Sequence, residues 1–310
     1  AFKSWRNVTP YDRANLLRAF SNKVREHREE LAQLEIDNSG HTRGNALWEA
    51  DNVANVLNYY AGVPERLYGR QIPVAGGVDI TFKEPIGVVG IIVPWNFPMP
   101  IAGWGFAPAL AAGNTVILKP APETVATAWI LAQQLWEGGV PKDVLQFVPT
   151  RDDDSGKHLV THEGIDALIL TGAFDTANMF VNWKPELNIL AETSGKNALV
   201  ISACADIDAA VKDLVQSAFG HAGQKCSAAS LGIIVESIYK DPSFIRQLVD
   251  DVSTLKVGAG WNFGTTVGAV IRKPEGALLR ALTTLDEGES WLVEPQQLDQ
   301  AGQLWRPGVK

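Results

Sequence analysis

The chain has 310 residues, of which 46% are hydrophobic and 20% are charged, a composition typical of a folded protein with room for two domains. Acidic residues outnumber basic ones by 35 to 27, and the net charge of -8 disfavours a protein that holds nucleic acid through phosphate contacts. The most apolar run, Ile86 to Val93, is too short for a membrane span and is interrupted by two glycines, so we expect neither a nucleic-acid nor a membrane partner.

The first part of the chain is predicted to be helical, because apolar residues recur mostly at intervals of three and four from Tyr11 to Leu34. A second helix is expected from Ala46 to Tyr60. The pattern then changes, since Val78 to Phe82 and Gly87 to Val93 are short, rich in β-formers and separated by Lys83-Glu84-Pro85. We interpret these two runs as a pair of strands joined by a turn.

Beyond this pair, short β-branched runs alternate with helical segments, which is typical of a parallel sheet with crossover helices. The expected strands are 115–118, 144–148, 167–170, 189–190, 198–201 and 231–235, and the expected helices are 124–137, 207–219 and 242–255. Three aspartates, Asp152 to Asp154, are interpreted as a solvated loop rather than a cation site. The alternation predicts an α/β fold with a Rossmann-like open sheet, although the G-x-G-x-x-G fingerprint of ordinary Rossmann dehydrogenases is absent.

Cysteine content and the first residues bear on the cellular compartment. Cys204 and Cys226 are too few for a disulfide framework, and their spacing is not that of a zinc site. Ala1 to Thr9 show neither the apolar core nor the cleavage site of a signal peptide. We therefore expect a cytoplasmic protein without a bound metal.

Several expected strands end in residues able to do chemistry. Asn96 lies in Pro94-Trp95-Asn96-Phe97-Pro98, where the prolines hold a rigid turn from which the amide can donate to an oxyanion. Lys119, Gly172 and Glu192 follow three further β-runs, and open parallel sheets bind ligands at the carboxyl ends of their strands. Taken singly, these residues could have ordinary structural roles: the Asn96 segment as an aromatic turn, Lys119 as a solvated lysine and Glu192 as a solvated loop glutamate.

Cys226 lies among small residues, between an expected helix and an expected strand, in His221-Ala222-Gly223-Gln224-Lys225-Cys226-Ser227-Ala228. A lone cysteine is more often a small core residue than a nucleophile, so its neighbourhood decides the interpretation. One alternative is a thiol hydrolase that uses Cys226 with His221. It is disfavoured because no third, orienting residue is evident and the segments of Asn96, Lys119 and Glu192 would have no role.

Together and in this order, these segments resemble the aldehyde dehydrogenase superfamily, from about Ala46 to the end of the chain. Glu192 precedes Cys226 by 34 positions, the separation of general base and nucleophile in that family. The resemblance implies that Cys226 is the nucleophile, Glu192 the general base and Asn96 the oxyanion donor. For the cofactor it implies ribose contact by Lys119, a pyrophosphate beside Gly172, and a dinucleotide path along Pro94 and Trp95.

The resemblance also implies an aldehyde dehydrogenase-like domain organisation. Residues 1–195 would form the NAD(P)-binding domain and residues 196–310 part of the α/β catalytic domain. The strand pair at about 78–92 would belong to an oligomerisation arm, so the full-length protein is expected to form a homo-oligomer. NAD is the expected cofactor, and NADP stays open because Pro122 stands where many relatives carry a ribose-binding glutamate.

Within the superfamily, Ser217-Ala218-Phe219 and Gly223 to Ala228 are most similar to L-glutamate γ-semialdehyde (Δ1-pyrroline-5-carboxylate) dehydrogenases, including the dehydrogenase part of bifunctional proline-catabolic enzymes. Ser227 would then hydrogen-bond the α-carboxylate of the substrate, with a helix or loop cap as its alternative role. The chain stops at Lys310, before the family's Glu-x-Phe-Gly-Pro segment, so the resemblance predicts a C-terminally truncated chain that is inactive by itself. The remaining alternatives are a non-catalytic dinucleotide-binding relic and an aldehyde dehydrogenase for another semialdehyde.

Overall fold

The computed structural model describes residues 1–151 and 153–310, and it divides into two compact units. The first unit comprises residues 1–34 and 47–193, and the second comprises residues 35–46 and 194–310. Asp152, the first of the three consecutive aspartates, lies outside the described residues.

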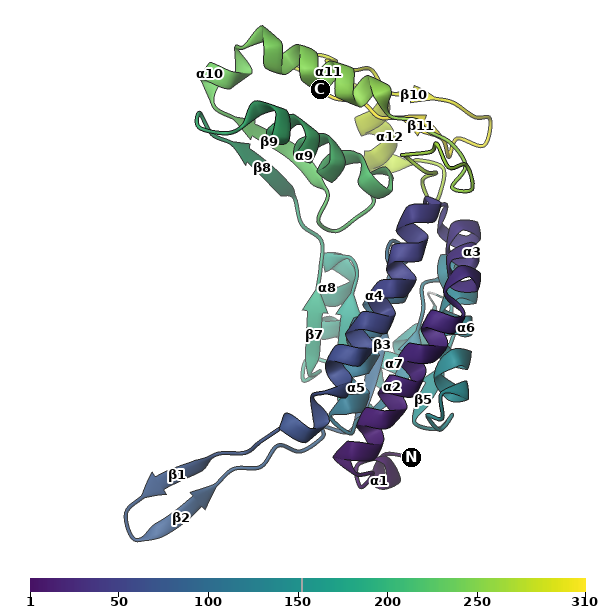
Figure 1. Ribbon diagram of the computed structural model, residues 1–310, viewed down its shortest axis with the longest axis vertical. Helices are drawn as coiled ribbons and strands as arrows, with labels where there is room; N and C mark the ends of the chain where they lie inside the picture. Colours follow the sequence, from purple (N-terminus) through teal and green to yellow (C-terminus); the bar gives the residue numbers. More distant parts are fainter. Residues whose placement is uncertain (152) are drawn as a thin grey trace. The chain divides into compact units, whose positions relative to one another are not determined.

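A five-stranded parallel sheet forms the centre of the first unit (Figure 1). Its strands, in the spatial order β5-β4-β3-β6-β7, are β5 (Leu145–Phe147), β4 (Thr115–Lys119), β3 (Val88–Ile92), β6 (Ala167–Thr171) and β7 (Ile189–Glu192). The chain builds one half of the sheet outward from β3 and then returns to β6 on its other side. This reversal of strand order confirms the predicted open α/β sheet and creates a switch point, where such sheets bind ligands.

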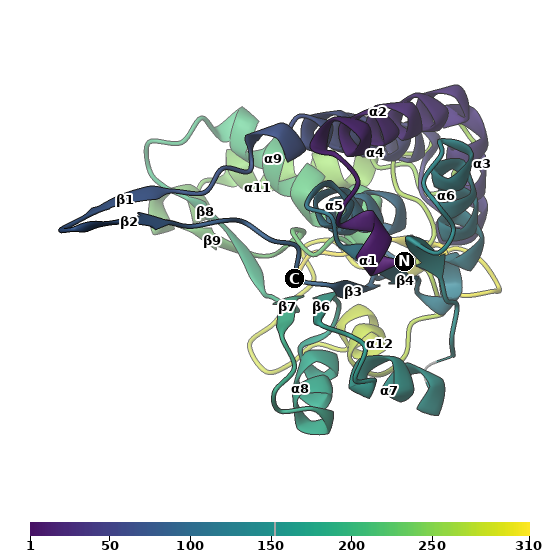
Figure 2. The same ribbon diagram turned by 90° about the horizontal axis from the view of Figure 1, so that it is seen from below.

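Helices cover both faces of this sheet (Figure 2). One face carries α5 (Pro98–Ala111) and α6 (Val125–Glu137), with α2 (Pro10–Glu26) and α4 (Arg43–Ala61) packed outside them, and the other carries α7 (Asp154–Thr161) and α8 (Phe174–Trp183). The short helical pieces of this unit are α1 (Phe2–Trp5), η1 (Pro64–Arg66) and η2 (Pro122–Thr124).

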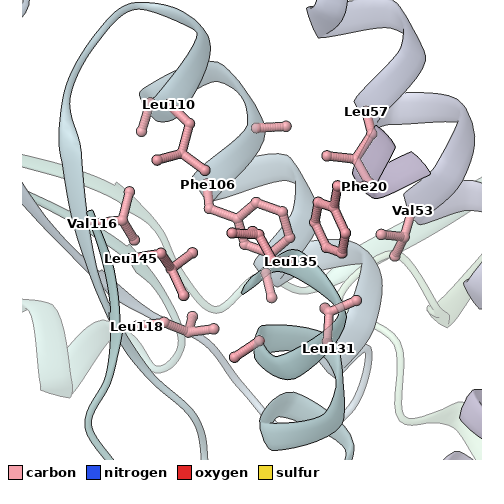
Figure 3. Close-up of a cluster of buried hydrophobic side chains, with 14 of the residues drawn as sticks. Phe20, Val53, Leu57, Phe106, Leu110, Val116, Leu118, Leu131, Leu135 and Leu145 are labelled. Atoms are coloured by element: carbon pink, nitrogen blue, oxygen red, sulfur yellow. The ribbon is translucent and has the colours of Figure 1, made fainter. Parts of the chain in front are cut away.

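The core extends from the sheet through α5 and α6 to α2 and α4. Phe20 and Phe106 meet there with ring centroids 5.6 Å apart, and both side chains are fully buried. Leucines from α6 and from the strands surround them in Figure 3, including Leu131, Leu135 and Leu118. Burial of side chains of this size contributes about 1.5–3 kcal/mol each, which explains why the apolar runs decide the fold.

The long helix expected from Tyr11 to Leu34 is two helices, because α2 ends at Glu26 and α3 (Arg28–Ser39) begins after His27. His27 has a φ of −100° and a ψ of 16°, outside the helical range, and caps α2. Helix α5 was not predicted. It is buried on nearly every side, so it lacks the amphipathic periodicity by which helices are recognised in a sequence.

The predicted pairing of Val78–Phe82 with Gly87–Val93 is wrong. Strand β2 (Gly77–Ile80) instead pairs in antiparallel fashion with β1 (Gln71–Val74), while β3 lies in the parallel sheet. The turn is formed by Ala75 and Gly76, and Gly76 has a φ of 75°, which suits a tight hairpin. Strand β1 escaped prediction because it contains Pro73, and proline within a strand is confined to edges such as this one.

The second unit is built on β8 (Asn197–Ile201) and β9 (Ala229–Ile234), which pair in parallel, as the alternation of elements predicted. Helices α9 (Ile207–Phe219) and α11 (Pro242–Thr254) bury Val215, Phe244 and Val252 against Ile201. The smaller elements are η3 (Gly220–Gly223), α10 (Glu236–Tyr239), α12 (Gly276–Thr283), β10 (Gln296–Gln297) and β11 (Trp305–Arg306).

Two other features bear on the sequence predictions. The predicted acidic loop holds for Asp153, an exposed turn residue that caps α7 by accepting a hydrogen bond from the backbone of Ser155, but not for Asp154, which begins that helix. Over the described residues, no helix combines the length and the apolar composition needed to cross a membrane.

Candidate functional site

The residues predicted at strand ends gather at the carboxyl edge of the five-stranded sheet. Lys119 is the last residue of β4, Glu192 is the last residue of β7, and Gly172 directly follows β6. Backbone hydrogen bonds join these ends, from Val93 N–H to the Lys119 carbonyl at 3.2 Å and from Gly172 N–H to the Glu192 carbonyl at 3.1 Å. Since the strands are parallel and in register, this edge follows directly from the sheet topology.

Asn96 lies on the turn between β3 and α5, at the same edge. The turn is held by Phe97, whose ring is buried and stacks on Trp48 with centroids 5.7 Å apart. Trp104 approaches the same ring edge-on at 5.5 Å, and Pro98 begins α5 immediately afterwards. The aromatic cluster and the proline therefore restrain the backbone on the C-terminal side of Asn96, which is itself half-buried together with Pro94 and Trp95.

The groups at this edge suit a dinucleotide. The Lys119 side chain is buried, and its Nζ lies 3.4 Å from the Pro120 carbonyl oxygen, so an ammonium group is held at the strand end. Gly172 leads into the N-terminus of α8, which no side chain caps, and backbone N–H groups at a helix start favour phosphate oxygens.

Glu192 differs from Lys119 in its environment, because its side chain is exposed at the end of β7. An exposed carboxylate at a strand end is accessible to water. That is the property a general base needs if it is to activate a water molecule.

Cys226 and Ser227 lie in the second unit, on the loop between η3 and β9, and both are exposed. Directly before the loop, η3 contains three successive residues in the left-handed region: His221 at φ 53°, Ala222 at φ 56° and Gly223 at φ 72°. Left-handed conformations cost about 1–2 kcal/mol for each residue that carries a β-carbon. A turn of this kind persists only where the surroundings hold it, and such strain concentrates at functional sites.

Side-chain amides hold this loop on two sides. Gln224 donates to the Ala269 carbonyl at 3.3 Å and accepts from the Ile271 N–H at 2.8 Å. On the other side, the Asn197 amide donates to the Cys226 and Ala228 carbonyls at 2.5 Å and 3.2 Å. Sequence reasoning missed both contacts, because long-range side-chain bonds to a loop backbone leave no periodic signal.

His221 packs within the second unit against His41, with ring centroids 4.7 Å apart and an edge-to-face orientation. Burial, together with the nearby His41 and Lys225, lowers the pKa of His221 to about 3. Burial also lowers the pKa of His41, so the 3.4 Å approach of its Nδ1 to Glu35 is not an ion pair at neutral pH. His221 is therefore neutral and weakly basic, which is a poor starting point for a general base.

A cavity of about 780 Å³ lies elsewhere in the first unit. Val88, Val116 and Gln146 of the sheet and His158 and Leu159 of α7 line it. None of the predicted site residues does, so we place the candidate chemistry at the sheet edge and on the Cys226 loop.

Comparison with known proteins identifies the architecture. The aldehyde dehydrogenase family matches residues 1–309. The chain belongs to this family. Betaine aldehyde dehydrogenase of Bacillus subtilis is 33% identical over 274 residues, which cover 86% of this chain and 55% of that protein.

Two solved structures extend the comparison. Proline Utilization A (PutA) from Corynebacterium freiburgense is 40% identical with a TM-score of 0.88, over 97% of this chain and 30% of that one. A betaine aldehyde dehydrogenase from Staphylococcus aureus in complex with NAD⁺ is 33% identical with a TM-score of 0.84, over 91% of this chain and 57% of that one. The present chain thus spans little more than half the length of the curated relatives it matches.

Proposed function

We propose that the protein containing this chain oxidises an aldehyde to a carboxylic acid with NAD(P), and that its substrate is L-glutamate γ-semialdehyde. Membership of the family supports the reaction class. The observation that carries the proposal is the exposed Cys226 thiol on a strained, tethered loop, in a chain whose Glu192 is exposed at a strand end.

The first step falls to Cys226. Its thiolate adds to the carbonyl carbon of the aldehyde and forms a thiohemiacetal oxyanion, which needs hydrogen-bond donors. The side-chain amide of Asn96 and the backbone N–H of Cys226 are suitable donors. The turn of Phe97 and Pro98 restrains the former, and the loop contacts of Asn197 and Gln224 restrain the latter.

Bound NAD(P) supplies the acceptor for the hydride that leaves the thiohemiacetal carbon. The Lys119 ammonium and the start of α8 after Gly172 are the groups that would bind its ribose and pyrophosphate. The resulting thioester on Cys226 is cleaved by water. Glu192 takes a proton from that water as its oxygen attacks the acyl carbon, and the carboxylic acid leaves while Cys226 regains its thiolate.

The choice of substrate rests on two observations. The PutA chain is 40% identical over nearly all of this chain, more than the betaine aldehyde dehydrogenases compared above. Ser227 is exposed directly beside the nucleophile, and its hydroxyl is a suitable donor to the α-carboxylate that glutamate semialdehyde carries and betaine aldehyde lacks.

Parallel kinetics test this choice. The enzyme that contains this chain should oxidise glutamate γ-semialdehyde with a kcat/KM at least about tenfold above that for betaine aldehyde, and Ser227→Ala should reduce this ratio mainly through KM. Assays with NAD⁺ and NADP⁺ side by side establish the cofactor preference. A higher kcat/KM for betaine aldehyde would contradict the proposed substrate while leaving the reaction class intact.

The hydrolase alternative is disfavoured by the environment of His221. A histidine with a pKa of about 3 takes up protons poorly at neutral pH, so it cannot readily activate the Cys226 thiol. Aldehyde oxidation instead gives Asn96, Lys119 and Glu192 each a role.

A further inference from the structure

Asn197 is the first residue of β8, and its side chain reaches the loop that carries the nucleophile. Its Nδ2 donates to the carbonyl oxygen of Cys226 at 2.5 Å and to that of Ala228 at 3.2 Å. The two acceptors flank Ser227, so one neutral amide binds the backbone on both sides of the residue that follows Cys226.

A β-bulge sets up this contact. Asn197 pairs with Ala229 while Ala198 pairs with Leu231, so the register shifts and Ser230 has no counterpart on β8. The Ser230 hydroxyl instead donates to the backbone carbonyl of Asn197 at 3.2 Å. Bulges redirect side chains and are common beside active sites, and here the bulge fixes the backbone of Asn197 where its amide meets the loop.

Other hydrogen bonds restrain the loop on either side of this point. A turn is closed by the Ala228 N–H, which donates to the Lys225 carbonyl at 3.1 Å, and the strand ladder begins only at Ala229. The strained turn at His221 and Ala222 lies on the other side of Cys226. Asn197 therefore bonds the carbonyl of the nucleophile itself, between the turn and the strand.

We propose that Asn197 is a positioning residue for aldehyde oxidation: by binding the Cys226 and Ala228 carbonyls, it fixes the direction of the Cys226 thiol and the place of the Ser227 hydroxyl. This inference rests on the proposed function. The side chain must donate twice to neutral oxygens, which an amide does and a carboxylate does not.

Asn197→Asp is the sharpest change, because it preserves shape while replacing two donors by a carboxylate that faces two carbonyl oxygens. A misplacement of about 1 Å costs on the order of a hundredfold in rate, so kcat for the aldehyde should fall by about that factor. KM for the aldehyde should rise by no more than it does in Ser227→Ala, because only the Ser227 contact with the substrate is disturbed, and the affinity for NAD⁺ should stay within about threefold. Asn197→Gln, which keeps the donors, should recover part of the lost kcat.

Two measurements distinguish a positioning role of Asn197 from a merely structural one. Alkylation by iodoacetamide builds no oxyanion that needs aligned donors, so its rate at Cys226 should change by less than about threefold. Cys204, an exposed thiol of the same unit, is the internal control for that measurement. Amide hydrogen exchange over residues 225–229 should accelerate in Asn197→Asp, whereas Asn262→Asp, the same charge change on an exposed loop of the same unit, should leave it unchanged.

Each outcome decides the proposal. A large loss of kcat with normal alkylation, a rise in KM no greater than that of Ser227→Ala, and faster exchange at the loop supports it. Unchanged kcat, unchanged exchange, or a parallel loss of alkylation and turnover overturns it. If the wild-type enzyme oxidises none of the aldehydes offered, the proposed function fails. The exchange rates over residues 225–229 then still decide whether Asn197 holds the nucleophile loop.

Discussion

Two glycines of the turn before Cys226 should respond in opposite directions to the same substitution. Gly223 has a φ of 72°, and a β-carbon there would lie 3.0 Å from the Ala218 carbonyl oxygen. Gly220 has a φ of −54° and a ψ of 138°, which any residue adopts, and a β-carbon there meets nothing within 4 Å. The pair therefore isolates backbone conformation as the variable.

For Gly223→Ala, the left-handed conformation costs about 1–2 kcal/mol and the tight carbonyl contact adds to it, partly offset by the lower entropy of the unfolded chain. We expect the free energy of unfolding to fall by about 1.5 kcal/mol. Gly220→Ala should raise it by about 0.4–1 kcal/mol, because only the unfolded state is affected. The two variants should thus differ by about 2 kcal/mol.

Urea unfolding followed by tryptophan fluorescence, at equal protein concentration, measures both values. Alkylation of Cys226 in the same samples reports whether the Gly223 change reaches the nucleophile three residues later. Equal stability of the two variants would refute the left-handed turn as described, and so would a stabilised Gly223→Ala.

Three further predictions concern the chemistry and its pH dependence. Cys226→Ala should abolish aldehyde oxidation while NAD⁺ affinity stays within about threefold, and retention of more than a few per cent of turnover would remove Cys226 from the nucleophile role. Glu192→Gln should leave a rapid burst of NADH followed by slow turnover, because the base is needed only for the attack of water; loss of the burst with cofactor still bound would contradict this division. The pKa of His221 is lowered to about 3 from an ordinary value near 6.5, so the folded state favours the neutral ring. The folded protein therefore keeps its full stability from this residue above pH 6.5 and loses it as the pH falls from 6.5 toward 3. His221→Gln should flatten the decline of the urea midpoint between pH 7 and pH 4, and an equal decline in both proteins would argue against the buried neutral ring.

The gathering of the candidate site residues at one edge of the sheet was predictable because it follows from a rule of topology. Lys119 and Glu192 end β-branched runs, and parallel strands bring such ends to one edge whatever the details of packing. Helix α5 was not predictable from periodicity, since it is apolar all round, and β1 was obscured by Pro73.

The geometry of the Cys226 loop required the structure for a different reason. The left-handed turn at His221 and Ala222 uses residues that disfavour such a conformation, so tertiary contacts override local preference there. The contact of Asn197 with this loop likewise depends on a register shift between β8 and β9, a long-range pairing that neither strand displays in its own sequence.

Intact-protein and peptide mass spectrometry can show whether Cys226 carries the substrate as a thioester. Glu192→Gln enzyme, incubated with NAD⁺ and glutamate γ-semialdehyde and quenched in acid during the burst, should carry one acyl group on the peptide that contains Cys226. The peptide that contains Cys204 should remain unmodified, and Cys226→Ala should carry no acyl group. An NADH burst without an adduct on Cys226, or an adduct confined to Cys204, would show that Cys226 is not the nucleophile.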